Sequence, residues 1–110
     1  MKLEGLSAGI VHWPSLPETS HPGAAGSATV RAAVIGNIRM RLVTYSPGYV
    51  ADHWCVKGHL TFVLSGAVEI EQADGSGHHV TAGMSYHVGD GDKQAHRLSS
   101  KGGATLFIVD

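Results

Sequence analysis

Short apolar runs, most of them closed by glycine, follow one another from residue 29 to the end of the chain. Gly36 and Asn37 separate TVRAAVI from IRMRLVTY, which predicts a hairpin of two strands. In the second run apolar residues alternate with Arg39 and Arg41, as expected of a strand with one wet face. Further strands follow at the spacing of an antiparallel sandwich or barrel. They are expected in residues 49–55, HLTFVLSG, AVEIEQ, HHVTAG, MSYHV, AHRLSS and ATLFIVD.

The first 28 residues differ from the rest. They hold Trp13, three of the four prolines and several Gly and Ser without a strand or helix period, so residues 1–28 are interpreted as an irregular N-terminal arm. Residues 29–110 are then one barrel domain, because 110 residues match the common size of a single domain. The final run, ATLFIVD, is apolar on both faces and suits a core or a dimer seam. Together with the arm it leads us to expect a homodimer.

Charge and hydropathy argue against several classes of protein. The formal net charge is -1 and only 15% of the residues are charged, so nucleic acid is not an expected partner. No apolar run approaches the about 20 residues of a membrane helix, and the N-terminus lacks the continuous apolar stretch of a signal peptide. We therefore expect no membrane partner and a cytoplasmic location.

Histidines and the single cysteine supply the candidate chemistry. Cys55 has no second cysteine to pair with, so a special role would come from its thiolate. In a strand, His53 and Cys55 would point to the same side. His59 could lie opposite them after the chain breaks and reverses direction, and His96 would come from a distant strand. Such donors, if they converge in a pocket, suit a transition metal. Ordinary core or surface histidines and an inert buried cysteine remain the alternatives.

The stretch from Gly48 to Gly66 resembles the first motif of the cupins. That motif has the form G-x5-H-x-H-x3,4-E-x6-G, and this chain reads G-x4-H-x-C-x3-H-x6-G. His53 and Cys55 fall on the two histidine positions, His59 on the glutamate and Gly66 on the closing glycine.

The second cupin motif, G-x5-P-x-G-x2-H-x3-N, is matched more loosely. Gly83, Gly89, Gly91 and Ser100 occupy its positions, and His96 comes two residues late. The run YSPGYVADHWCVKGH narrows the resemblance to the small bacterial cupins named for an Asp-His-Cys-Trp motif, a subfamily without a firmly assigned activity. The resemblance, which covers roughly residues 38–110, implies a cupin-type antiparallel β-barrel (jelly roll) that binds a divalent metal through His53, Cys55, His59 and His96.

The donor set bears on the metal and on function. Compared with the His-His-Glu-His set of cupins, it adds a thiolate and removes a carboxylate, which favours zinc, with iron, nickel or copper as alternatives. Four bound donors would make a closed, structural site, whereas a site that keeps Cys55 off the metal would have an open position.

Two functions follow for the barrel. One is a metalloenzyme, oxygenase- or isomerase-like, that acts on a small molecule, with His87 or a tyrosine moving protons. The other is a non-catalytic small-molecule-binding cupin with a structural metal. Tyr45, Tyr49 and Tyr86 either line the barrel mouth or pack in their strands. A nucleophilic Cys55 activated by a histidine is a third interpretation.

Overall fold

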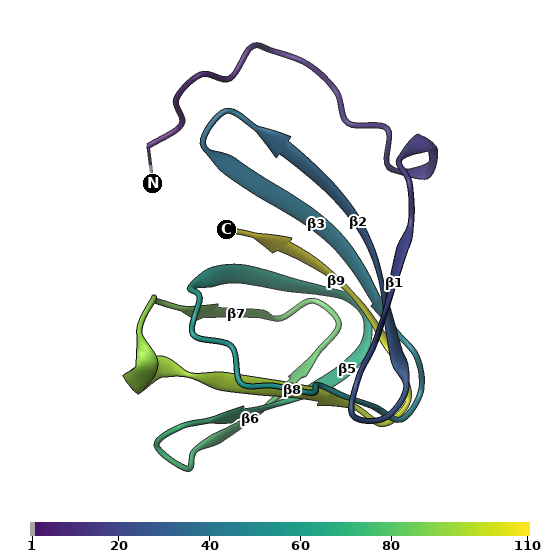
Figure 1. Ribbon diagram of the computed structural model, residues 1–110, viewed down its shortest axis with the longest axis vertical. Helices are drawn as coiled ribbons and strands as arrows, with labels where there is room; N and C mark the ends of the chain where they lie inside the picture. The colour runs from purple at the N-terminus through teal and green to yellow at the C-terminus, as the bar shows by residue number, and fades with distance from the viewer. Residues whose placement is uncertain (1) are drawn as a thin grey trace.

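The computed structural model describes residues 2–110, and almost all of their regular structure is antiparallel β-strand (Figure 1). This confirms the predicted all-β class. Within residues 2–110 no helix is long and apolar enough to cross a membrane. The elements are η1 (Trp13–Ser15), β1 (Thr19–Pro22), β2 (Ser27–Ile35), β3 (Ile38–Tyr45), β4 (Tyr49–Val50), β5 (His59–Gln72), β6 (Gly77–Thr81), β7 (Ser85–Val88), η2 (Asp92–Gln94), β8 (His96–Ser100) and β9 (Ala104–Val109).

The long strand β5 joins the two halves of the fold. Its first half pairs with β7 and β9, and its second half pairs with β6 and β8, so the sheet curls into a half-barrel (Figure 1). The register shifts between Val63 and Ser65, just before Gly66. Gly66 has φ 76°, and a Cβ there would lie 2.2 Å from the carbonyl oxygen of Gly103. Only glycine fits where β5 passes from one sheet to the other without displacing the neighbouring backbone.

The apolar core lies between the two halves of the curled sheet. In β9 the residues Ala104, Leu106 and Ile108 are buried, at 5%, 0% and 5% exposure, and face this core. The alternate residue Phe107 lies on the convex side, where its ring meets that of Trp13 edge-on at 6.0 Å. β9 is therefore a central strand, with the core on one side and the N-terminal arm on the other.

The arm is more ordered than its sequence suggests. Thr19–Pro22 forms β1 and pairs with β2, which begins at Ser27 rather than Thr29. All four residues of β1 are exposed, so no alternation of apolar and polar residues marks this strand. Its position depends on backbone pairing and on Arg31, which donates hydrogen bonds to the Leu16 carbonyl and the Glu18 carboxylate.

The segment that carries the first motif also departs from prediction. A strand was expected over residues 49–55, but β4 ends at Val50 and the chain bends through residues 52 and 53. It rejoins the sheet only at Cys55, through an isolated bridge to His96.

Candidate metal centre

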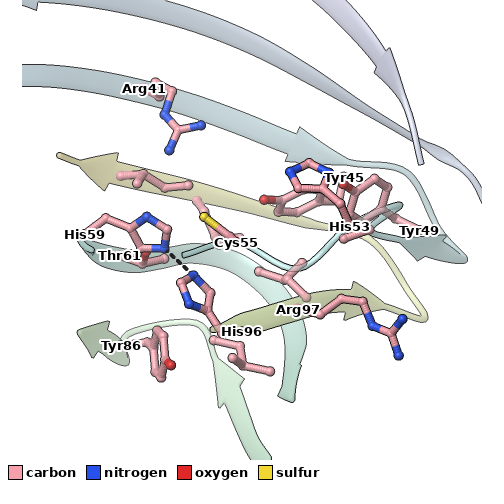
Figure 2. Close-up of a pocket in the computed structure, with 15 residues that line it drawn as sticks. Arg41, Tyr45, Tyr49, His53, Cys55, His59, Thr61, Tyr86, His96 and Arg97 are labelled. Carbon is pink, nitrogen blue, oxygen red and sulfur yellow. Dashed lines mark hydrogen bonds between the residues drawn. The ribbon is translucent and has the colours of Figure 1, made fainter. Parts of the chain in front are cut away.

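Three side chains converge on one point at the concave side of the sheet. Cys55 and His96 are opposite partners, joined by backbone hydrogen bonds of 2.8 and 3.0 Å in the two directions, which places their side chains on the same side. His59, the first residue of β5, reaches the same point, and its Nε2 lies 3.0 Å from Nε2 of His96 (Figure 2). The candidate ligand atoms of all three residues lie within 4.8 Å of one another.

The hydrogen bonds of the two rings fit a metal ion between them. His96 Nδ1 lies 3.1 Å from the Gln94 carbonyl oxygen and must donate to it, so in the neutral ring Nε2 carries the lone pair. If His59 Nε2–H donates to that lone pair, His59 Nδ1 carries no proton and can only accept a hydrogen bond. This Nδ1 is buried and has no donor within residues 2–110. The polar group beside it is the Asp110 carboxylate, which lies 4.0 Å away and is itself an acceptor.

A bound cation would remove the conflict, because His59 could then direct Nδ1–H toward Asp110 while Nε2 of both rings served as ligands. Two zinc-bound nitrogens in a tetrahedron lie about 3.3 Å apart, close to the separation observed here.

The electrostatics of the site favour the metal-binding form of His59. Burial, reinforced by the neighbouring His96, lowers the pKa of His59 from 6.5 to about 4, so its imidazole is neutral at physiological pH. Asp110 receives three hydrogen bonds, two from Arg39 at 2.9 and 3.0 Å and one from Arg41 at 3.1 Å. Burial pushes the pKa of Asp110 upward, but the hydrogen bond from Arg39 and the charges of both arginines outweigh it and leave that pKa below its ordinary value. An ionised carboxylate therefore stands behind His59.

The fourth predicted ligand, His53, is not part of this cluster. Its Nδ1 lies 2.6 Å from Oδ1 of Asp52 and its side chain is 77% exposed. The expected strand is interrupted at this point, so the rule that residues two apart share a face does not apply to His53 and Cys55. The structure brings Cys55, His59 and His96 together and places His53 in the wall of the adjoining cavity. Coordination by His53 stays a prediction.

A cavity of about 170 Å³ adjoins the three donors. The three tyrosines weighed from the sequence, Tyr45, Tyr49 and Tyr86, all contribute to its wall. His87, the other candidate for proton transfer, is exposed and does not line it. Tyr86 and His87 are consecutive in β7 and therefore point to opposite faces. The wall is formed by Arg41, Tyr45, Tyr49, Ala51, His53, Cys55, His59, Thr61, Ile70, Tyr86, His96, Arg97, Leu98, Leu106 and Ile108.

Arg41 is a residue of this cavity that the sequence analysis did not single out. The alternation in β3 was correctly recognised, but it was interpreted as a strand with one wet face that carries Arg41. In the structure Arg41 and Val43 share the concave side, whereas Ile38 and Met40 line a groove under the N-terminal arm. The polar face of the strand is thus the inner one at this end. One sequence signal could have indicated this arrangement. The N-terminal arm contains apolar residues that can cover the apolar face of β3, and its polar face is then left to point inward.

Comparisons with known proteins bear on the fold. No protein-family model and no curated protein sequence matches the chain. Among solved structures, an RmlC-like cupin from Shewanella frigidimarina is 16% identical, with a TM-score of 0.72 over 96% of this chain and 91% of that one.

Two further solved structures are named for enzymes. A sugar phosphate isomerase from a cupin superfamily, from Silicibacter pomeroyi, is 17% identical, with a TM-score of 0.70 over 92% of this chain and 74% of that one. Ectoine synthase from P. lautus is 13% identical, with a TM-score of 0.70 over 93% and 76%. The chain has the cupin fold, as the motif resemblance implied.

Proposed function

We propose that this protein is a metal-dependent cupin enzyme that acts on a small molecule in the barrel cavity. The observation that carries the proposal is the convergence of Cys55, His59 and His96, with the two Nε2 atoms 3.0 Å apart and a buried His59 Nδ1 that hydrogen bonding within residues 2–110 leaves unsatisfied. A thiolate with two imidazoles favours zinc, and iron, nickel or copper are the alternatives.

Three protein donors beside a cavity favour catalysis over a purely structural site. A catalytic zinc site has three protein ligands and one open position, whereas a structural site is closed by four. With His53 directed to Asp52, a metal held by the three donors would keep one position open to the adjoining cavity. A metal bound there would act as a Lewis acid toward a substrate oxygen or water, which suits oxygenase- or isomerase-like chemistry. If His53 turned inward to close the site, the alternative would hold: a non-catalytic binding barrel with a structural metal.

The surrounding residues would orient a ligand and hold protons. Tyr86 lines the cavity with its hydroxyl buried, and burial raises the pKa of Tyr86, so the hydroxyl stays protonated at neutral pH. Asp110, clamped by Arg39 and Arg41, would hold the His59 ring in the orientation that directs Nε2 inward. Leu106 and Ile108 form an apolar part of the cavity wall.

Elemental analysis of untagged protein, purified without added metal, tests this proposal. We expect about one metal ion per chain in the parent, its loss in His96→Ala and a reduced content in Cys55→Ser. His53→Ala should keep the metal, as should the matched control His87→Ala, which removes an exposed histidine outside the cavity.

Circular dichroism would confirm that each variant is folded. Loss of metal in His53→Ala but not in His87→Ala would favour the closed, structural site. A parent that neither contains a metal nor takes up added zinc would refute the metal proposal.

A further inference from the structure

A second, larger cavity opens on the concave side of β1, β2 and β3. Its volume of about 570 Å³ is in the range of small-molecule sites. It shares Arg41, Tyr45, Tyr49 and His53 with the cavity beside the candidate metal donors, so the two lie next to each other. We call the larger one the outer cavity and the one beside the donors the inner cavity.

Two arginines of β3 line the outer cavity. Arg39 and Arg41 are two residues apart in the strand, so their side chains leave it on the same face. Both reach Oδ2 of Asp110, which accepts a hydrogen bond from Nη2 of each, at 3.0 and 3.1 Å. The Asp110 side chain is 1% exposed, whereas those of Arg39 and Arg41 are 39% and 22% exposed. A buried carboxylate thus holds two guanidinium groups side by side in the cavity wall.

Each guanidinium keeps an accessible donor that the fold does not use. Arg39 bonds Asp110 through Nε and Nη2, and Arg41 bonds it through Nη2. Within residues 2–110 neither Nη1 atom has a hydrogen-bond partner, and unlike Nε of Arg41 neither is buried. Since one carboxylate balances two guanidinium groups, a positive charge also remains there. Accessible N–H groups that carry a positive charge favour an oxyanion.

The other ionisable groups of the outer cavity do not neutralise this pair. Asp52 is the carboxylate found among the described residues of its wall. Its Oδ1 lies 2.6 Å from Nδ1 of His53, and within residues 2–110 no ion pair joins Asp52 to Arg39 or Arg41. The rings of His21 and His53, which also line the cavity, are neutral or positive and add no negative charge.

The rest of the wall suits the body of a small organic molecule. Val30 of β2 and Val43 of β3 are opposite partners in the sheet and form an apolar surface beside the arginines. Tyr45 follows on the same face of β3, and its ring stacks on that of Tyr49 with the centroids 4.4 Å apart. An apolar and aromatic surface therefore continues from the arginines to the boundary with the inner cavity.

We propose that the outer cavity binds the oxyanion of a small organic acid, a phosphate or a carboxylate group, through Nη1 of Arg39 and Arg41. This names the substrate class of the proposed enzyme and rests on the proposed function for the role of the adjoining metal. Asp110 fixes both guanidinium groups before the ligand arrives, which lowers the entropy cost of binding. Arg41 extends from β3 toward the side of Cys55 and His59 (Figure 2), so an acid held there has its body next to the inner cavity.

The test is titration of the full chain with phenyl phosphate and with benzoate, followed by NMR or calorimetry. Benzyl alcohol, which is of similar size and has no charge, is the control ligand. We expect an acid to bind more tightly than benzyl alcohol, and the tighter of the two acids identifies the oxyanion. Arg39→Gln should weaken its binding about 10- to 100-fold, as expected for the loss of a charged hydrogen bond. Arg39→Lys, which keeps the charge and a donor for Asp110, should lose less.

Arg97→Gln is the matched control. It removes an arginine that lines only the inner cavity and donates to the Glu71 carboxylate, so acid binding should be unchanged. Circular dichroism would confirm that each variant is folded. Three results would each overturn the proposal: no binding of either acid, equal affinity for the acids and benzyl alcohol, or equal losses in Arg39→Gln and Arg97→Gln.

Each titration is run on zinc-loaded and on chelator-treated protein to separate this inference from the proposed function. The acid should bind in both states, because the arginines and not the metal hold its oxyanion. Binding that requires zinc and is unchanged in Arg39→Gln would place the acid on the metal and overturn the inference. Binding that depends on Arg39 in a protein that takes up no metal would support the oxyanion site while refuting the metalloenzyme. Zinc uptake without acid binding would do the reverse.

Discussion

The ring of His59 is the group through which pH is expected to act most clearly on the metal-free protein. Its pKa is about 4 in the fold, chiefly because it is buried, against an ordinary value of 6.5. In the unfolded chain the ring returns to about 6.5. Below that pH the unfolded state therefore binds a proton that the folded state does not, and the free energy of unfolding falls as the pH drops from 6.5 toward 4.

The size of this effect follows from the two pKa values. A pKa difference of one corresponds to about 1.4 kcal/mol, so the full difference is worth about 3 kcal/mol, of which about 2.5 kcal/mol is lost between pH 7.5 and 4.5. The His59 side chain is only 11% exposed, so solvent screening takes little from this value.

Urea unfolding in the presence of a chelator, followed by tryptophan fluorescence at both pH values, measures this loss. The parent should lose about 2.5 kcal/mol more than His59→Gln, which keeps a polar side chain but has no proton to gain. Every other titrating group is common to the two proteins, so the difference between their losses isolates His59. Equal losses in parent and variant would refute the assignment of a neutral, buried imidazole.

Three further measurements test other parts of the structure. Gly66→Ala should lose about 2–4 kcal/mol of unfolding free energy, because the alanine would combine a positive φ with a Cβ 2.2 Å from a carbonyl oxygen. Gly75→Ala is the control, with φ 88° and open space around the Cβ, and should lose only about 1 kcal/mol. Equal losses in the two variants would contradict the close approach at Gly66. Without ligand, Tyr86→Phe should leave stability unchanged or raise it by up to about 1 kcal/mol, since it removes an unpartnered hydroxyl, and a clear loss in urea unfolding would mean that the hydroxyl is bonded. The predicted homodimer would cover Leu60 and Phe62, which are 51% and 39% exposed on β5; light scattering should give a dimer for the parent and a monomer for Phe62→Glu, and a monomeric parent would reject it.

Much of the fold was predictable because its signals are local. The turn at Gly36 and Asn37 lies where the hairpin of β2 and β3 reverses, and the final apolar run forms β9. Strand β1 was not predictable, because its four exposed residues carry no hydrophobic alternation and are held by backbone pairing with β2. Local patterns report which residues prefer to be buried, and β1 buries none.

The candidate site was partly determined by sequence. Motif positions led to Cys55, His59 and His96, and the fold brings them together across β5, β8 and the bridge between residues 55 and 96. Tertiary structure alone placed His53 outside the cluster, because the chain leaves the sheet between Val50 and Cys55.

The inward direction of Arg41 was likewise decided by tertiary structure. Alternation along a strand shows that its two faces differ in polarity. The curl of the whole sheet, and the arm packed on its convex side, decide which of the two faces becomes the interior. The sequence by itself therefore determined most of the strands and most of the candidate metal donors. The positive charge of Arg41 reaches the cavity only because β3 curves over His59 and turns a polar strand face toward the candidate metal centre (Figure 2).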